Sequence, residues 1–442
     1  MRAACEARPG VTVTLPQAPD SRDEPGRGAA ERFRRVALDV TPLKVSPGFR
    51  RLLTGDAVSV IGTQVTAVAV PIQVYAQTHS GAAVGFVGLA GLLPLIVFGL
   101  YGGAIADAVD RRSLVILTTL GQTALSVVLL GQALAGLHST ALLYAVVAVQ
   151  AGLFSMDSPA RSAFTPRLLP THLLPAANAL KQVEFNIGVT VGPLLAGLLV
   201  AGPGYATAYG LDALSFGASM WAVLSLPPMP PAGGGRKAGT ASVLEGLAFL
   251  RTRPVLMMTF VVDLIAMVFA MPRALFPSIA HDVYGGGPQT AGALYSALAA
   301  GALLGALFGG WLGRVHRQGV AVLVAIVAWG VAITAFGLSD RLWFGLLMLA
   351  AAGCSDMISA VFRNAILQTA APDEMRGRLG GVFIVVVAGG PRLGDGRAGI
   401  GSELVGPQAA VVAGGLAVVA LTVACAAAVP MFARYDVREP TA

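Results

Sequence analysis

The sequence predicts an all-α polytopic membrane protein with twelve membrane-spanning helices arranged as two six-helix halves. Two observations predict this class. Apolar residues make up 55% of the 442 residues, about 243, and charged residues only 12%, whereas an ordinary soluble domain has roughly 25% charged residues. Twelve bilayer-spanning helices of roughly 20 residues need about 240 residues. The second observation is that apolar segments of spanning length recur along the whole chain, in two groups of six.

The chain divides in order into five parts. Residues 1–47 are rich in Arg, Pro and Gly and lack an apolar stretch long enough for a signal-peptide core, so we expect a disordered cytoplasmic tail. Six apolar segments make up the N-terminal half, residues 48–226, and six more make up the C-terminal half, residues 255–434. Residues 227–254 contain Pro and Gly runs and are expected to form a cytoplasmic linker. Residues 435–442 are expected to be a cytoplasmic C-terminal tail.

The positions of the expected spans follow from the apolar runs and the charged or Gly/Pro-rich breaks between them. The spans cover residues 52–77, 82–105, 113–136, 139–160, 180–202, 204–226, 255–280, 290–313, 319–339, 342–362, 379–402 and 407–432.

Lys and Arg residues gather in alternate loops. With the N-terminus placed in the cytoplasm, 26 of the 30 Lys and Arg residues fall in cytoplasmic segments, which is the asymmetry expected of membrane proteins. The net charge of +7 therefore reflects topology and not a nucleic-acid surface. We expect a multi-pass protein of the cytoplasmic (inner) membrane that contacts the lipid bilayer, binds no nucleic acid and has both termini in the cytoplasm.

The two halves are similar to each other in sequence. The stretch that closes the second segment, Gly102–Asp107, matches the stretch that closes the eighth, Gly309–Arg314, at an offset of 207 residues. Duplicated halves are typical of secondary transporters, in which two similar units rock around a central site. Because one chain supplies both halves of such a site, we expect the protein to work as a monomer.

The loop between the second and third segments carries the motif Gly103-Ala-Ile-Ala-Asp107-Ala-Val-Asp110-Arg111-Arg112. It resembles the Gly-x-Leu-Ala-Asp-Arg-x-Gly-Arg-Lys signature loop of the major facilitator superfamily, with two departures, one of them Asp110 in place of the usual Gly. The resemblance implies the major facilitator fold and a conformational-switch role for this loop. Asp107 would cap a helix and form a charge relay, and Arg111 and Arg112 would hold the loop at the lipid face. The alternative is that these residues only anchor a short loop.

The fifth segment carries a second motif, Gly188-Val-Thr-Val-Gly192-Pro193-Leu-Leu-Ala-Gly197. Glycines at four-residue spacing form a flat face for close helix contact, and Pro193 is expected to kink the helix. The stretch resembles the Gly-x-x-x-Gly-Pro-x-x-Gly-Gly element of the superfamily's antiporters, with Ala in place of one Gly, and so implies export. Generic packing of small residues is the alternative.

Two loops narrow the resemblance further. Residues 158–180 and 363–378 resemble the fourth-to-fifth and tenth-to-eleventh loops of the superfamily branch that contains enterobactin and macrolide exporters, and the likeness covers residues 44–434. One antiporter feature is missing, because Val147 stands where an Arg often precedes Gln-x-Gly in the fourth helix. Proton coupling, if present, depends on other residues.

Five ionisable residues within the spans are candidates for proton coupling or substrate binding: Asp263, Asp395, Arg392, Asp56 and Glu184. Charged groups are costly in a bilayer and usually functional. Asp263 has no basic residue one helical turn away and would be unpaired unless another helix supplies a partner, which suits a proton carrier. Asp395 has Arg392 one turn before it, in a Gly- and Pro-rich stretch expected to line a cavity. Snorkelling or pairing at an interface is the alternative for Asp56 and Glu184.

Two acid–arginine pairs are candidate gates. Asp157 and Arg161 are one helical turn apart, and Asp356 and Arg363 are two turns apart. Both pairs lie near the cytoplasmic ends of equivalent segments in the two halves. We therefore expect salt bridges there to open and close the cytoplasmic side.

These observations predict a function. The other polar and aromatic positions favour a cavity for a bulky, amphipathic, often cationic compound. A phosphate-binding loop and a His-Glu-x-x-His pattern are both missing from the sequence, so we expect no cofactor, no metal and no enzymatic activity. The sequence predicts a transporter that exports small organic molecules in exchange for protons by alternating access. The alternatives are a dedicated siderophore or secondary-metabolite exporter and, from another class, a membrane enzyme or sensor that transports nothing.

Overall fold

The computed structural model of the chain describes residues 39–230, 240–372, 375, 379 and 382–438. Within these ranges the description does not include the side chains of Gly103, Ala104, Ala106, Asp107, residues 240–244, Trp311 and Ile384. The chain from Val40 onward forms one compact unit.

Part of the expected N-terminal tail is helical. Residues 1–38 lie outside the described residues, but Thr41–Val45 form the short helix α2. Leu43 in this helix packs against a small buried cluster that includes Phe49. The described part of the tail is therefore attached to the first long helix.

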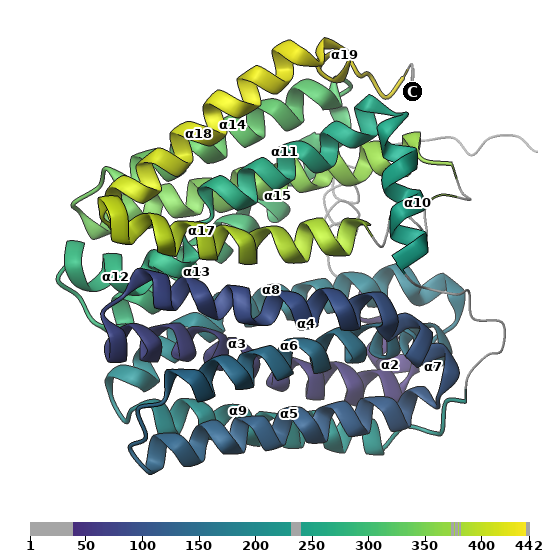
Figure 1. Cartoon of the computed structure of the whole chain (residues 1–442). Coiled ribbons are helices and arrows are strands. Elements are labelled where there is room, and N and C mark those ends of the chain that lie inside the picture. The colour runs from purple at the N-terminus through teal and green to yellow at the C-terminus, as the bar shows by residue number, and fades with distance from the viewer. Residues whose placement is uncertain (1–38, 231–239, 373–374, 376–378, 380–381, 439–442) are drawn as a thin grey trace, which may run out of the picture. The chain divides into compact units, whose positions relative to one another are not determined.

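The long helices fall into two sets, which follow one another in sequence (Figure 1). The N-set consists of α3 (Pro47–Thr78), α4 (Gly81–Ala108), α5 (Arg111–Leu134), α6 (Thr140–Ser162), α8 (Leu174–Ala201) and α9 (Tyr205–Leu224). The C-set consists of α11 (Pro254–Ala270), α13 (Pro288–Leu307), α14 (Gln318–Gly337), α15 (Leu342–Ala370), α17 (Gly389–Val405) and α18 (Pro407–Ala428).

Shorter elements connect the long helices. They are α7 (Thr165–Leu168), η1 (Thr171–Leu173), α10 (Thr240–Arg251), η2 (Arg273–Leu275), α12 (Phe276–Ser278), η3 (Ile279–Val283), η4 (Gly309–Arg314), η5 (Ile384–Ala388) and α19 (Pro430–Ala433). Helix α10 occupies part of the expected linker and lies beside both sets in Figure 1.

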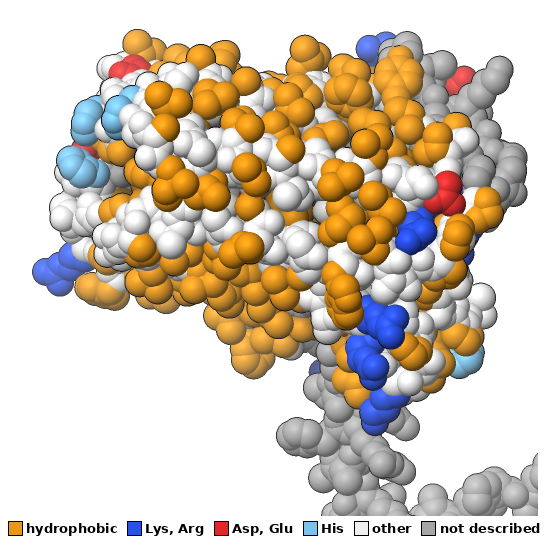
Figure 2. Space-filling model, turned by 90° about the horizontal axis from the view of Figure 1, so that it is seen from below, with side chains coloured by type: hydrophobic (Ala, Val, Ile, Leu, Met, Phe, Trp, Pro, Cys, Tyr) orange, Lys and Arg blue, Asp and Glu red, His pale blue; other side chains and the backbone are white. Residues whose placement is uncertain are grey.

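The helices have the length and composition of membrane spans. Ten helical segments among the described residues are long and apolar enough to cross a membrane, whereas α9 and α17 are not among them. Figure 2 shows apolar side chains covering most of one face, with Lys and Arg side chains gathered toward one end. This distribution is the one expected of a protein whose middle faces lipid.

The first four long helices begin with a capping side chain. Backbone N–H groups at a helix start have no partner within the helix, and a bilayer offers none. Ser46, Ser80, Asp110 and Ser139 each accept a hydrogen bond from the backbone N–H three residues later. The sequence thus fixes where each of these helices starts.

The starts of the long helices repeat at constant offsets. Three pairs of first residues are 207 residues apart: Pro47 and Pro254, Gly81 and Pro288, and Arg111 and Gln318. Two later pairs are 202 residues apart: Thr140 and Leu342, and Tyr205 and Pro407. The repeat seen at one loop in the sequence therefore extends along both sets, with five residues fewer in the C-set between the third and fourth helices.

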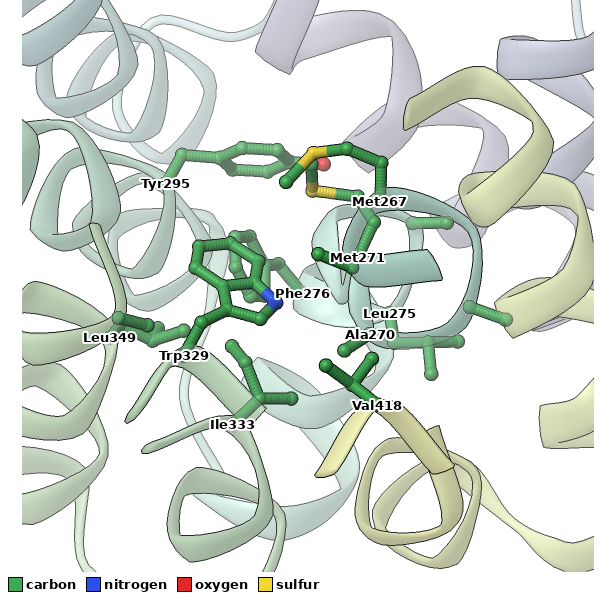
Figure 3. Close-up of a cluster of buried hydrophobic side chains, with 14 of the residues drawn as sticks. Met267, Ala270, Met271, Leu275, Phe276, Tyr295, Trp329, Ile333, Leu349 and Val418 are labelled. Atoms are coloured by element: carbon green, nitrogen blue, oxygen red, sulfur yellow. The ribbon is translucent and has the colours of Figure 1, made fainter. Parts of the chain in front are cut away.

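The expected span at 255–280 is not one continuous helix. Helix α11 ends at Ala270, just before Pro272, which has no N–H group to continue the hydrogen-bond ladder. The chain continues as η2, α12 and η3. Leu275 and Phe276 are fully buried, and Phe276 packs edge-on against Tyr295 with ring centroids 4.8 Å apart. Figure 3 shows this cluster, which holds the broken segment in place.

The two sets contact each other mainly through α4 with α17 and through α8 with α13. We call the end where α3 and α11 begin, next to α10, the linker end. We call the opposite end, where α3 ends at Thr78 and α4 begins at Gly81, the latched end. The two ends carry different groups of charged and polar residues.

Candidate functional site

An ion network lies near the linker end of the N-set. Arg161 of α6 donates from Nη1 to Asp56 Oδ1 of α3 at 2.7 Å and from Nη2 to Thr119 Oγ1 of α5 at 2.9 Å. Its Nε group donates to Asp157, which also accepts a hydrogen bond of 2.7 Å from Thr118. The Arg161 side chain is only 17% exposed. One cation therefore joins three helices and holds two carboxylates.

The candidate coupling residue Glu184 lies in α8, close enough to Arg161 and Asp56 to interact with their charges. Lys181, one turn before Glu184, also interacts with Asp56. Neither residue forms a salt bridge with the network among the described residues, so α8 interacts with it through longer-range charge alone.

A matching ion pair lies in the C-set. Arg363 of α15 forms a salt bridge with Asp263 of α11, and its Nη2 lies 3.8 Å from Asp356 Oδ1. The Asp263 side chain is 4% exposed. A cavity of about 10 Å³, room for about one water molecule, lies beside the pair, and Arg363 Nε has no hydrogen-bond partner among the described residues.

Another helix thus supplies the partner that Asp263 lacks on its own helix. Its partner, Arg363, is 100 residues later in the chain (263 to 363), on a helix that packs against α11. A search for bases one turn away on the same helix could not find it. Asp263 remains a candidate for coupling, but as one half of an ion pair.

The two networks occupy equivalent positions of the repeat. Asp56 and Asp263 are 207 residues apart, and Arg161 and Arg363 are 202 residues apart, as are the starts of their helices. Each aspartate is the ninth residue after its helix's first residue, about 14 Å from that end at 1.5 Å per residue. The repeat therefore places one acid–arginine pair at the same depth in each set.

Hydrogen bonds join the two sets at the latched end. Tyr75 of α3 donates to Asp282 Oδ2 of η3 at 2.7 Å. Glu403 of α17 accepts hydrogen bonds from Ser80 Oγ at 2.7 Å and from the Ala82 backbone N–H at 3.1 Å. These hydrogen bonds cross between the N-set and the C-set.

Glycines at the latched half of α8 and α13 allow backbone contact between the sets. A Cβ atom added to Gly292 of α13 would lie 2.4 Å from the Pro193 carbonyl oxygen of α8, and one added to Gly197 would lie 2.6 Å from the Pro288 carbonyl oxygen. Such distances are too short for any side chain. The second half of the motif at 188–197 therefore faces the other set.

The first half of that motif faces α3 in its own set. A Cβ atom added to Gly188 would lie 2.3 Å from Val60 Cγ1, and one added to Gly192 would lie 2.5 Å from Gln64 Cβ. The motif thus brings α8 against two helices at once, one from each set.

Helix α17 repeats this motif 202 residues later, which the sequence analysis missed. Gly390, Gly394 and Gly399 stand at the places of Gly188, Gly192 and Gly197. A Cβ atom added to Gly85 of α4 would lie 2.5 Å from the Asp395 carbonyl oxygen and 3.1 Å from Gly399 Cα. The contact between α4 and α17 is therefore the repeat of the contact between α13 and α8. A search of the C-terminal half for the same glycine spacing would have found it, whereas the offset of 207 residues seen at the signature loop would not.

The signature loop joins α5 to α9 and to the start of the linker. Asp110 caps α5 by accepting from the Ser113 backbone N–H at 2.8 Å, and its other oxygen accepts from the Met229 N–H at 2.8 Å. Arg112 donates to the carbonyl oxygens of Val223 and Leu224 at the end of α9. Asp110 thus forms the N-cap of α5, and Arg112 binds the end of α9.

Other members of this loop are described only in part. Gly103 and Asp107 lie in the last turns of α4, but their side chains lie outside the description. The backbone N–H of Arg111 donates to the Met229 carbonyl oxygen at 3.2 Å. The charge relay expected of Asp107 stays a prediction.

Replacing Asp110 with Ala is expected to lower the free energy of unfolding by about 1 kcal/mol, because α5 loses its cap. Burial favours the neutral carboxyl, but the hydrogen bonds from Ser113 and Met229 and the charge of Arg112 outweigh it and hold the pKa of Asp110 below its ordinary value of 3.8. A lowered pKa stabilises the fold above pH 3.8, and this contribution is lost as the pH falls through the lowered value. Thermal unfolding of both proteins in detergent, measured from neutral to acid pH, should show the difference shrinking below that pH; a constant difference would contradict the assignment.

A group of half-buried charged residues of the C-set lies where this set meets α4. Arg392 and Asp395 of α17 lie close enough to Arg273 of η2 for their charges to interact. Asp395 Oδ1 accepts from the Ala274 backbone N–H at 3.2 Å. Arg397 donates to the Phe269 carbonyl oxygen at 2.5 Å. The candidate residues Arg392 and Asp395 are thus brought together, and Arg273 joins them.

Membrane-spanning helices in two repeated sets, in contact at one end and with an ion network in each set at the other, define a polytopic membrane protein with a transporter fold. Residues 39–440 match a protein family described as transmembrane secretion effector. The chain belongs to this family, in the branch of the major facilitator superfamily that contains the enterobactin exporters.

Relatives and solved structures agree with this assignment. The chain is 31% identical over 394 residues to the enterobactin exporter EntS of Citrobacter koseri, covering 87% of this chain and 92% of the relative. It is 30% identical over 386 residues to EntS of Escherichia coli, covering 86% and 91% of the two chains.

Among solved structures, a mutant of the nucleoside transporter NupG superimposes with a TM-score of 0.72 at 13% identity, covering 86% of this chain and 99% of that one. A bacterial homologue of the iron transporter ferroportin in an inward-facing state gives a TM-score of 0.62 at 17% identity, covering 88% and 98%. These likenesses show the fold.

Proposed function

We propose that this chain is a secondary active exporter of small organic molecules that works by alternating access. In this proposal all twelve long helices, α9 and α17 included, span the cytoplasmic membrane as two six-helix halves. The linker end faces the cytoplasm and both termini lie on that side, as the distribution of Lys and Arg favours. One chain supplies both halves and works as a monomer.

The observation that carries the proposal is the difference between the two ends. The hydrogen bonds and backbone contacts that join the two sets lie toward the latched end, whereas the ion pairs near the linker end, Asp56 with Arg161 and Asp263 with Arg363, are each formed within one set. This arrangement is the one expected of a carrier that is closed outside and accessible from the cytoplasm.

Alternating access requires the latched end to separate at modest cost. The acceptors across the latch are carboxylates, and a hydrogen bond to a charged group contributes roughly 1.5–3 kcal/mol, so these bonds together are worth several kcal/mol. A bound substrate or proton can shift a two-state equilibrium of that size. Closing the linker end would bring the two ion networks toward each other, which gives Asp157, Arg161, Asp356 and Arg363 the role of gate residues.

Proton exchange is the proposed source of energy. Asp263, Asp56 and Glu184 are carboxyl groups within reach of an arginine near the linker end. Protonation of such a carboxylate would release its arginine to bind a new partner, which couples a proton to a change of conformation. Asp395 offers a second carboxylate deeper in the C-set.

A dedicated siderophore or secondary-metabolite exporter is the second candidate. One observation favours it: the relatives that are 30–31% identical over most of the chain are named enterobactin exporters. The two candidates differ only in the breadth of substrates.

Inverted membrane vesicles with an imposed proton gradient test both candidates. The panel contains cationic drugs, macrolides and siderophores, and the controls are Asp107→Asn and vesicles without the protein. We expect the wild type to accumulate at least one compound while the gradient collapses, and Asp107→Asn to remain in the membrane but transport nothing. Accumulation without collapse would refute proton exchange, and normal transport by Asp107→Asn would refute the switch role. A reaction catalysed by the purified protein without solute movement would refute export.

A further inference from the structure

The break in the seventh span gives a structural role to two charged residues of α17, Asp395 and Arg397. The helix stops at Ala270, so backbone groups on either side of the break lack their helical partners. Arg397 donates to the Phe269 carbonyl oxygen, and Asp395 accepts from the Ala274 N–H. These two side chains therefore replace hydrogen bonds that the broken helix has lost.

Arg273 and Arg392 replace no backbone hydrogen bond of this kind. Among the described residues, the guanidinium groups of Arg273 and Arg392 form no hydrogen bond and no salt bridge. The Arg273 guanidinium lies over the ring of Tyr295, 5.8 Å from its centroid, and the Tyr295 hydroxyl donates to the Arg273 carbonyl oxygen at 2.8 Å. Together with Asp395, the two arginines leave a net charge of +1 in this region.

The cluster lies deep in the membrane, where the two sets meet. Arg392 is 13 residues before Val405, the last residue of α17, which is about 20 Å along the helix axis. Its Nε lies 3.4 Å from where a Cβ atom of Gly91 in α4 would be, and Val147 of α6 lines the same spot. The side chain therefore reaches from the C-set toward two helices of the N-set.

The repeat supplies an internal comparison. The positions equivalent to Arg392, Asp395 and Arg397 are Thr190, Pro193 and Leu195 in α8, 202 residues earlier. Helix α8 makes the same close contact with α13 without any charge. Close contact between the sets therefore does not require the charges of α17. The packing of the helices does not explain why residue 392 is an arginine.

We propose that Arg273 and Arg392 form a binding site for the acid group of an organic anion, so that the exported molecules are anionic. A guanidinium group binds carboxylate, sulfonate and phosphate oxygens in a paired geometry, and charged groups at this depth need compensation. Asp395, held by the Ala274 N–H, offsets one of the two positive charges, which weakens the hold on the anion enough for it to leave. This inference rests on the proposed export function and replaces the cationic compound favoured by the sequence.

Binding of two dyes with the same xanthene scaffold tests the inference. Purified full-length protein in lipid nanodiscs is titrated into anionic fluorescein or cationic rhodamine 123, and fluorescence anisotropy reports binding after subtraction of empty nanodiscs. We expect fluorescein to bind at least about tenfold more tightly, and Arg273→Gln or Arg392→Gln to weaken it by about tenfold each, as for loss of one charge-assisted contact. Arg392→Lys should restore part of the affinity. Arg341→Gln, an exposed arginine at the start of α15, is the matched control.

The inference is overturned if the wild type binds no fluorescein, if it prefers rhodamine 123, or if both glutamine variants bind fluorescein like the wild type. Equal elution volume and thermal unfolding midpoint of the variants show that each remains folded. The vesicle measurement separates this result from the proposed function. If the protein transports a solute but the variants bind fluorescein like the wild type, only the anion site is refuted. If fluorescein binding depends on the arginines but no solute is transported, only the export function is refuted.

Discussion

Arg363→Gln is expected to abolish transport and to destabilise the protein. The substitution leaves Asp263, whose side chain is 4% exposed, without its cation. Removing one member of a buried ion pair costs about 3–5 kcal/mol, because the other charge stays buried and unpaired. We expect the thermal unfolding midpoint in detergent to fall and vesicle transport to drop by about a hundredfold or more, which corresponds to about 2.7 kcal/mol.

A second substitution separates the two effects. The double variant Asp263→Asn/Arg363→Gln leaves no charge at the buried position 263, and Asp356, which also loses its arginine, is 39% exposed, so the unfolding midpoint should return toward that of the wild type. Its transport should stay absent, because the pair is proposed to open and close the cytoplasmic side. Arg341→Gln, at the other end of the same helix, should leave both measurements unchanged. Recovered transport in the double variant would show that the pair has only a structural role.

The equivalent test in the N-set uses Arg161→Gln. Arg161 holds both Asp56 and Asp157, whose side chains are 12% and 7% exposed, so its loss leaves two largely buried carboxylates unpaired. Arg363 also has a second partner, Asp356, but that side chain is 39% exposed. We expect a larger fall in the unfolding midpoint than for Arg363→Gln. An equal or smaller fall would contradict the assignment of Arg161 as the centre of the network.

Gly292→Leu is expected to open the latched end. A Cβ atom at this position would lie 2.4 Å from the Pro193 carbonyl oxygen, which belongs to the backbone of α8 and cannot turn aside. The two helices must separate, which breaks the contact between the sets without changing any charge. Transport should fall by about a hundredfold or more, because the free energy of binding a substrate or proton can no longer return the carrier to the state in which the latched end is closed.

Spin labels can follow this opening directly. Leu137→Cys and Leu338→Cys place exposed labels at the latched end, one in each set, after the native cysteines are replaced. The distance between the labels, measured by pulsed electron paramagnetic resonance, should increase in Gly292→Leu. Gly131→Ala is the matched control, since a Cβ atom there meets nothing within 4 Å. An unchanged distance with lost transport would point to misfolding and not to an open latch.

The sequence predicted the features that depend on local pattern. Apolar runs predicted the long helices, and a match between two loops predicted the repeat, which the structure extends to five pairs of helix starts. The loop motifs predicted the family, and the comparisons confirm it. These features are encoded within a few dozen neighbouring residues.

Features that depend on distant residues were missed. The partner of Asp263 is on a helix 100 residues away, and no pattern on α11 indicates it. The break after Ala270 was missed because the apolar run continues across it, although Pro272 was a visible signal. The cap that Asp110 forms at the start of α5 was also missed, because Asp110 is one of the two departures from the family pattern. The roles of the gate and coupling residues stay predictions.

The hydrogen bond between Tyr75 and Asp282 has a consequence for the history of the fold. The two residues are 207 apart, the offset of the repeat, so they occupy the same position in the two halves and meet each other across the interface. In a dimer of two identical six-helix chains, this position would face its own copy on a two-fold axis. Two tyrosines can share one hydrogen bond there, but two aspartates would repel each other. A tyrosine opposite an aspartate needs two halves that can differ in sequence, which a single chain with two halves allows and a dimer of identical chains does not.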